Sequence, residues 1–206
     1  MRIPIKKERI FRVLTTNRPS SISELSRKTG LAKSYVSRVV SALAQRGVVW
    51  GQLQAEPELL VREWGDLKRQ IFEMLKPLRL DVLIVNRIKR VFSEYVVSGP
   101  FAELVVQGGS PGRPVILYTT ADEFARKREQ ILRLGRVGRG QLWIYIYDSH
   151  VFSGSWVLRG WRLACVPQIA ADLVALGTYA DLGMELLRRW LDAGGRVQGS
   201  SPDLAA

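Results

Sequence analysis

A run of cations, hydroxyls and one aromatic side chain lies along a predicted helix between residues 32 and 45. Lysine and arginine bind phosphate oxygens, and arginine and hydroxyl groups also hydrogen-bond to base edges in the major groove of DNA. The opposite face of the helix is an apolar stripe with the spacing i, i+3, i+4, i+7, made by Val36, Val39, Val40 and Leu43. This pattern predicts a recognition helix for double-stranded DNA. The candidate DNA contacts are Lys33, Ser34, Tyr35, Ser37, Arg38, Ser41 and Arg46.

The preceding residues predict the elements that position this helix. Ser21 stands three residues before Glu24, a spacing with which hydroxyl and carboxylate satisfy exposed backbone donors at a helix start. The short helix that follows ends at Gly30, because glycine readily adopts the left-handed conformation that turns the chain. An earlier helix buries Ile10, Val13 and Leu14 and is broken at Asn17, Arg18 and Pro19. The spacing is typical of a helix-turn-helix.

Residues 48–62 extend the pattern into a predicted wing. Residues 48–53 are expected to form a strand, and a second strand or extended arm is expected near 59–61. Residues 29–49 resemble the winged-helix domains of prokaryotic regulators, and this resemblance implies DNA binding without naming a target. Ala32 departs from the pattern, because such domains usually have a capping Ser or Asp there.

The charge of the chain is concentrated in the same module. The net charge is +12, and residues 1–54 hold eleven Lys and Arg against two Asp and Glu, so nine of the twelve charges lie there. A basic module favours a polyanionic partner and predicts binding that weakens steeply with salt. An alternative is that the basic residues form a solvated face. The candidate phosphate contacts are Lys6, Lys7, Arg9, Arg12, Arg18 and Lys28.

Composition excludes several other classes of protein. No apolar run is long enough to span a bilayer, and the charged start is unlike a signal peptide, so we expect a cytoplasmic protein without a membrane partner. Cys165 is the single cysteine, which excludes an internal disulfide and a cysteine-based zinc site and is typical of a small buried residue. His150 is the single histidine, so we expect neither a metal nor another cofactor.

The sequence predicts an α+β fold, with an N-terminal winged helix-turn-helix domain followed by a small α/β domain that has a mixed sheet and C-terminal helices. The expected boundaries are 1–64, 65–192 and a flexible tail at 193–206. A helix is expected from residue 59 or 64 to about 75, another from Thr120 to before Gly135, and a final pair after Pro167. Short β-branched or aromatic runs predict strands at 82–85, 95–97, 104–106, 115–118 and 142–147.

Three catalytic interpretations have weak support. Asp148, Ser149 and His150 are adjacent, whereas triads form between distant segments. Residues 107–114 have the Gly-Ser start of nucleotidyltransferase sites but no Asp-x-Asp pair to bind magnesium, so a loop is favoured. A nuclease could use Asp81, Glu103, Glu123 and Lys127, but these acids are scattered, and Glu123 and Lys127 have i,i+4 helix spacing. We therefore expect no enzyme, and a nucleic-acid-processing enzyme is the alternative.

The order of the whole chain resembles the AbiEi-type antitoxin and transcriptional-regulator family. The matching motifs are Pro-Glu-Leu-Leu followed by Trp64 at 57–64, and Pro-Gln followed by Asp172, Leu173 and Gly177 at 167–177. The resemblance implies a repressor that binds its operator, with the second domain contacting a nucleotidyltransferase-like toxin. Gln168 and Asp172 are interpreted first as residues that fix their helix against the sheet. The second domain is expected to serve dimerisation, toxin binding or ligand sensing, and a homodimer would match two DNA half-sites.

Overall fold

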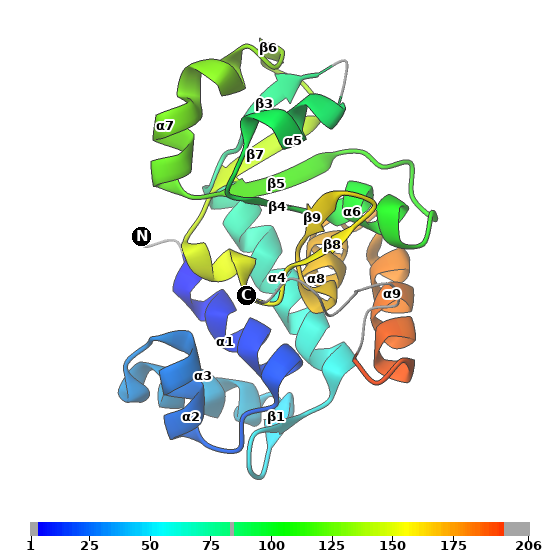
Figure 1. Ribbon diagram of the computed structural model, residues 1–206. Helices are drawn as coiled ribbons and strands as arrows, with labels where there is room; N and C mark the ends of the chain where they lie inside the picture. Colours follow the sequence, from blue (N-terminus) through cyan, green and yellow to red (C-terminus); the bar gives the residue numbers. More distant parts are fainter. Residues whose placement is uncertain (1–3, 83–84, 196–206) are drawn as a thin grey trace.

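The N-terminal module consists of three helices and a small hairpin. The computed structural model describes residues 4–82 and 85–195 (Figure 1). The three helices are α1 (Ile5–Asn17), α2 (Ile22–Thr29) and α3 (Lys33–Gln45). Strand β1 (Val49–Trp50) pairs antiparallel with β2 (Gln54–Ala55) to form the hairpin. The predicted helix-turn-helix and its wing are therefore present, in the expected order.

The remainder of the described chain is an α/β region. Its helices are α4 (Pro57–Met74), α5 (Ile88–Val91), α6 (Gly99–Val106), α7 (Ala121–Leu132), α8 (Val166–Leu176) and α9 (Ala180–Asp192). Its strands are β3 (Leu78–Asp81), β4 (Tyr95–Ser98), β5 (Val115–Thr119), β6 (Arg136–Val137), β7 (Leu142–Ile146), β8 (Trp156–Leu158) and β9 (Trp161–Leu163). Two short 3₁₀ helices, Val85–Arg87 and Ser149–Phe152, complete it. Residues 196–206 of the predicted tail lie outside the described residues.

The seven strands form one mixed sheet in the order β6-β3-β7-β5-β4-β9-β8. The β5–β7 and β4–β9 pairs are parallel, and the other four pairs are antiparallel. Helices α4 and α8 pack together, and side chains from both reach the Tyr118 hydroxyl of β5, so they cover the same face. Helices α5 and α7 lie at the far end from the helix-turn-helix (Figure 1). The predicted fold class, with its mixed sheet and C-terminal helices, is confirmed.

Two predicted strands are wrong, and each has a physical cause. Residues 59–61 belong to α4, because Pro57 suits the first helical turn and the Glu56 carboxylate accepts a hydrogen bond from the Leu59 amide. The wing therefore ends at Ala55. Residues 104–106 form the end of α6, where burial of Ala102 and Val105 on one face outweighs the β propensity of the valines. Of the strand expected at 82–85, residues 83 and 84 lie outside the described residues, β3 ends at Asp81, and Val85 begins a 3₁₀ helix.

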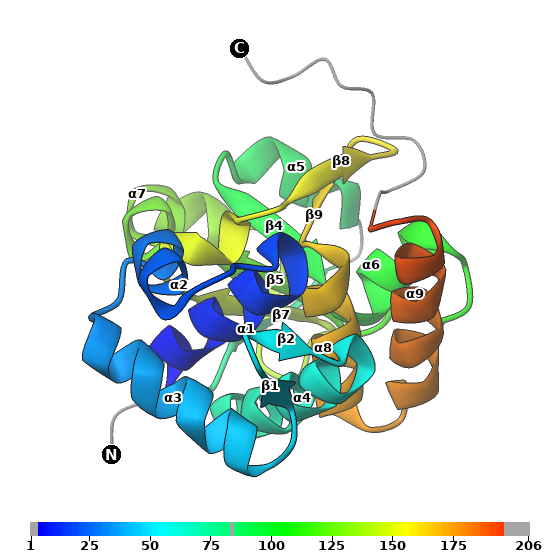
Figure 2. The same cartoon turned by 90° about the horizontal axis from the view of Figure 1, so that it is seen from below.

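Helix α4 runs continuously through the expected domain boundary at residue 64. It packs closely against α8 at Gly65, where a Cβ atom would lie 2.3 Å from Cγ1 of Val174, so only glycine fits there without a shift. Helix α1 contacts both α4 and α8, and Figure 2 shows it between α3 and the sheet. The buried apolar residues of both regions accordingly form one core. Among the described residues, no helix has the length and apolar content needed to cross a membrane.

Candidate DNA-binding surface

Local hydrogen bonds and a left-handed glycine define the two ends of α2. The Ser21 hydroxyl accepts from the Glu24 amide at 3.2 Å, as predicted. The Glu24 carboxylate accepts from the amide of Ser20, at 2.8 Å, rather than from Ser21. This hydrogen bond and the bond from Lys28 lower the pKa of Glu24 to about 2. Gly30 then adopts the left-handed conformation with φ 66°, which ends α2 as expected.

Helix α3 presents the predicted polar face to solvent. Its apolar stripe is buried, with Val36 fully enclosed, whereas Lys33, Ser34 and Arg38 are exposed and Tyr35 is partly exposed. Ser37 and Ser41 are exposed as well. Ala32 makes no side-chain cap, so the first amides of α3 lack a side-chain partner at the capping position. Such a helix start is suited to bind a phosphate group.

The end of α3 and the hairpin continue this surface. Arg46 is exposed, and its guanidinium donates to the Glu63 carboxylate of α4 at 2.5 Å. Trp50 of β1 is 47% exposed, and its indole N–H donates to the Gln54 side chain across the hairpin. Because Arg46 already has an acidic partner, a phosphate would have to compete with Glu63 for it.

Some of the predicted phosphate contacts are accessible to solvent, whereas others form ion pairs within the protein. Lys6 and Arg18 are exposed and Lys7 is partly exposed. Lys28 pairs with Glu24 at 3.0 Å, one helical turn away. Arg9 pairs with Asp148 at 3.1 Å and also donates to the Thr29 carbonyl, so it ties α1 to α2 and to the α/β region.

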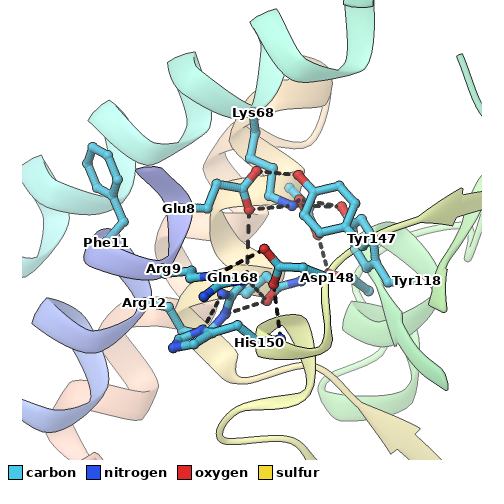
Figure 3. A network of polar contacts seen from close by, with 12 residues as sticks. Glu8, Arg9, Phe11, Arg12, Lys68, Tyr118, Tyr147, Asp148, His150 and Gln168 are labelled. Carbon is cyan, nitrogen blue, oxygen red and sulfur yellow. Dashed lines mark hydrogen bonds and ion pairs between the residues drawn. The ribbon is translucent and has the colours of Figure 1, made fainter. Parts of the chain in front are cut away.

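The prediction that Arg12 contacts phosphate is wrong. Its side chain is only 2% exposed and lies within a network of polar contacts (Figure 3). The guanidinium donates two hydrogen bonds to the Gln168 side-chain oxygen, at 3.0 and 2.8 Å, and a third to Nδ1 of His150 at 3.0 Å. It also lies 3.7 Å from the Glu8 carboxylate. Arg12 therefore fixes α1 to α8 and does not face solvent.

A buried charge cluster next to Arg12 completes this junction. The Lys68 ammonium lies 3.0 Å from a Glu8 oxygen and 3.1 Å from an Asp172 oxygen, and it donates to the Tyr118 hydroxyl at 2.9 Å (Figure 3). The Tyr147 hydroxyl donates to the other Glu8 oxygen at 2.5 Å. Burial raises the pKa of Asp172, and the Lys68 charge opposes that rise. We call Glu8, Lys68, Asp172, Tyr118 and Tyr147 the junction cluster.

Gln168 and Asp172 therefore fix α8, as the sequence suggested. Both are completely buried. Asp172 accepts from Tyr118 of β5 and from Ser98 of β4, which ties α8 to the sheet. Gln168 instead ties α8 to Arg12 of α1. The motif that suggested a family resemblance is accounted for by these internal contacts.

The pH dependence of stability should show the contribution of His150. Burial, followed by the nearby Arg12 charge, lowers the pKa of His150 below its usual 6.5. At His150 the unfolded chain therefore binds a proton more readily than the folded protein. The contribution of neutral His150 to the free energy of unfolding is fully present above pH 6.5 and is lost as the pH falls below that value. Urea unfolding between pH 5 and 7.5 should show this slope, and the His150→Gln variant should lose it. An unchanged slope in the variant would contradict the assignment.

Two of the acidic residues considered for catalysis, Glu103 and Glu123, have structural partners. The Glu103 carboxylate accepts from the amides of Gly109 and Ser110, which shapes the predicted 107–114 loop. The Glu123 carboxylate accepts a hydrogen bond from the Ser93 amide and forms an ion pair with Arg126 rather than with Lys127. In residues 4–82 and 85–195, no group of three or more His, Cys, Asp or Glu side chains is arranged to hold a metal ion.

The structure also tests the prediction for Cys165 and places three tryptophans of the α/β region. Cys165 is buried, as expected. Trp161 is buried edge-on against Phe101, whereas Trp143 and Trp156 are partly exposed. The Asp148 carboxylate accepts from the His150 amide and pairs with Arg9, so it does not orient the His150 ring.

The sequence reasoning missed the junction cluster, although a signal was present. Glu8, Phe11, Arg12 and Thr15 share the spacing i, i+3, i+4, i+7 and form a second buried stripe on α1. Lys68 likewise falls in the apolar stripe of α4, four residues after Trp64. Charged residues at helix positions that must be buried indicate internal partners, because an unpaired charge is costly to bury.

Comparison with known proteins agrees with the geometry of the N-terminal module. Residues 9–50, which are 42 of the 206 residues, match the model of the IclR helix-turn-helix domain. The match covers most of α1, all of α2 and α3, and β1. Comparisons with curated proteins and with solved structures give no match. The chain thus carries a helix-turn-helix domain of the IclR type, which supports a DNA-binding transcriptional regulator.

Proposed function

We propose that the protein is a sequence-specific repressor that binds double-stranded DNA through α3. The observation that carries this proposal is the outward face of α3, where Lys33, Ser34, Ser37, Arg38 and Ser41 are exposed together. This face combines cations for phosphates with short polar groups for base edges. The nine net positive charges of residues 1–54 would add a salt-dependent attraction to the DNA backbone.

The junction supports a fixed orientation of α3 relative to the α/β region. Helix α1 is held to α4 and α8 through Glu8 and Arg12, and these bonds are buried. If this connection is rigid, contacts between two copies of the chain would fix the distance between their two recognition helices. A homodimer on a two-fold symmetric operator is therefore part of the proposal.

The experiment begins with selection of bound sequences from a randomised duplex library by the full-length protein. The selected duplex is then titrated with the wild type and with Lys33→Ala, Arg38→Ala and the double variant in gel-shift experiments. We expect each single variant to bind about 10-fold more weakly or worse, because a base contact is worth about 1–3 kcal/mol. The slope of log affinity against log salt should fall by about one for each side chain that binds a phosphate.

The matched control combines Arg128→Ala on α7 with Arg133→Ala directly after that helix. Both arginines are exposed, and α7 lies far from α3 (Figure 1). This control removes the same charge as the double variant. Equal loss of affinity in both would mean that only total charge matters and would overturn the assignment to α3. Failure of the library to enrich any sequence would reject sequence-specific binding.

The antitoxin role is a finer hypothesis that depends on the AbiEi-type resemblance. Its second motif lies in α8, where Gln168 and Asp172 are buried and cannot meet a partner directly. A neighbouring gene for a nucleotidyltransferase, and co-purification of its product, would support this role. The enzyme alternative would be supported by metal-dependent cleavage or nucleotide transfer with the purified protein. We expect a cytoplasmic regulator without such activity.

A further inference from the structure

A pocket of about 580 Å³ lies between α9, the end of α6 and the turn that joins β8 to β9. Ligand sites commonly have volumes of about 300–1,000 Å³. Helices α9 and α3 lie on different sides of the molecule in both views (Figures 1 and 2). The pocket is therefore separate from the proposed DNA surface, and none of the contacts described above accounts for it.

One wall of the pocket is apolar. Leu158 of β8, Val166 at the start of α8, and Leu186 and Trp190 of α9 line it. Trp190 is partly exposed, so its ring is available beside the space. A wall of aliphatic groups and an indole ring favours a ligand with a large apolar part, because binding removes apolar surface of both the ligand and the wall from water.

Charges of both signs line the same pocket. Arg159 and Asp192 are exposed, and within the described residues neither of them forms an ion pair. Arg189 also lines the pocket but already pairs with Glu185. The free cation and the free anion thus complement a ligand that carries both a carboxylate and an ammonium group.

The backbone at Arg159 is an independent indication of function. Arg159 has φ 50° and is followed by Gly160 with φ 71°, in the two-residue turn between β8 and β9. Turns of this kind strongly prefer Asn, Asp or Gly at both positions, and an arginine there is strained. A strained residue that lines a pocket is a candidate for ligand binding.

Gln107 provides a further polar group. It follows α6 and lines the pocket, and its side-chain oxygen is buried with no hydrogen-bond partner within the described residues. A buried oxygen without a donor is unfavourable. Rotation of this amide toward the pocket would let the oxygen accept from a ligand N–H group.

We propose that this pocket binds a free amino acid with a large apolar side chain. Arg159 would bind its carboxylate, Asp192 and the Gln107 oxygen would accept from its ammonium group, and Leu158, Leu186 and Trp190 would cover its side chain. A ligand of this class uses every kind of group that the pocket offers. The proposal does not depend on DNA binding.

The test is isothermal titration calorimetry of the full-length protein with four probes. L-Tryptophan and L-phenylalanine carry all the required groups, whereas indole-3-propionate lacks the ammonium group and tryptamine lacks the carboxylate. We expect one molecule of L-tryptophan or L-phenylalanine to bind per chain. The two analogues of L-tryptophan should bind at least about 10-fold more weakly than L-tryptophan, since each loses a charged hydrogen bond.

Variants assign the two charges to their residues. Arg159→Gln should weaken L-tryptophan and indole-3-propionate but leave tryptamine unchanged, and Asp192→Asn should weaken L-tryptophan and tryptamine but leave indole-3-propionate unchanged. Arg162→Gln, an exposed change on β9, is the control and should bind like the wild type. Thermal melting checks that each variant is folded. Absence of amino acid binding at millimolar concentration, or variants that bind like the control, would overturn the proposal.

Discussion

Replacing Lys68 by Met is expected to lower the free energy of unfolding by about 3–5 kcal/mol. The ammonium group of Lys68 lies between Glu8 and Asp172, and all three side chains are at most 1% exposed. Met keeps the length of the side chain but removes the charge. Asp172 would then be buried without an ion-pair partner, and Glu8 would keep only Arg12 at 3.7 Å. The Tyr118 hydroxyl would also lose a donor.

Urea unfolding monitored by circular dichroism measures this loss. The control is Lys76→Met, because Lys76 is an exposed lysine just after the same helix and should change stability by about 0.5 kcal/mol or less. Combining Lys68→Met with Glu8→Gln and Asp172→Asn should restore part of the stability, since the unpaired charges are then removed as well. A Lys68→Met variant as stable as the control would show that the junction cluster is dispensable.

Replacing Arg12 by Leu should destabilise the protein by about 2–4 kcal/mol, because a buried hydrogen-bonded charge is lost. Gln168 would lose the donor of two hydrogen bonds and His150 the donor of one. Glu8 would also lose the guanidinium that lies 3.7 Å from its carboxylate. If Arg12 instead contacted phosphate, its removal would weaken DNA binding and leave stability unchanged.

The measurement is therefore paired, with unfolding by urea and DNA affinity determined on the same samples. Lys6→Leu is the matched control, because Lys6 is an exposed cation on the same helix. We expect Lys6→Leu to keep the stability of the wild type and to lower affinity only through charge. The reverse pattern, a stable Arg12→Leu variant with weakened DNA binding, would reinstate the phosphate contact.

The helix-turn-helix could be predicted because its determinants are local in sequence. The Ser21 cap, the left-handed Gly30 and the stripe of α3 each act within about one or two helical turns. The cap of α7 at Thr120 was predicted for the same reason, and its hydroxyl accepts from the Glu123 amide. Signals of this range depend little on the rest of the fold.

The partners within the junction cluster and the helical conformation of α6 could not be predicted, because distant residues decide them. The spacing on α1 indicates that Glu8 and Arg12 are buried, but only the folded protein shows that their partners are Lys68 of α4 and Gln168 of α8. The valines of α6 have high strand propensity, and their helical conformation depends on packing against α8 and β5. Tertiary contacts outweighed local preference at both places.

Helix α1 is part of the helix-turn-helix and also of the core of the α/β region, so the helix-turn-helix cannot easily be exchanged between proteins. One side of it packs in the helix-turn-helix, and the other carries Glu8 and Arg12 into the body of the protein. A fragment that ends at Ala55 would leave both charges facing water without Lys68 or Gln168. The N-terminal module is therefore not a unit that recombination could transplant unchanged onto another protein. A new body would have to supply a lysine and a glutamine at the same places, or α1 would have to change with it.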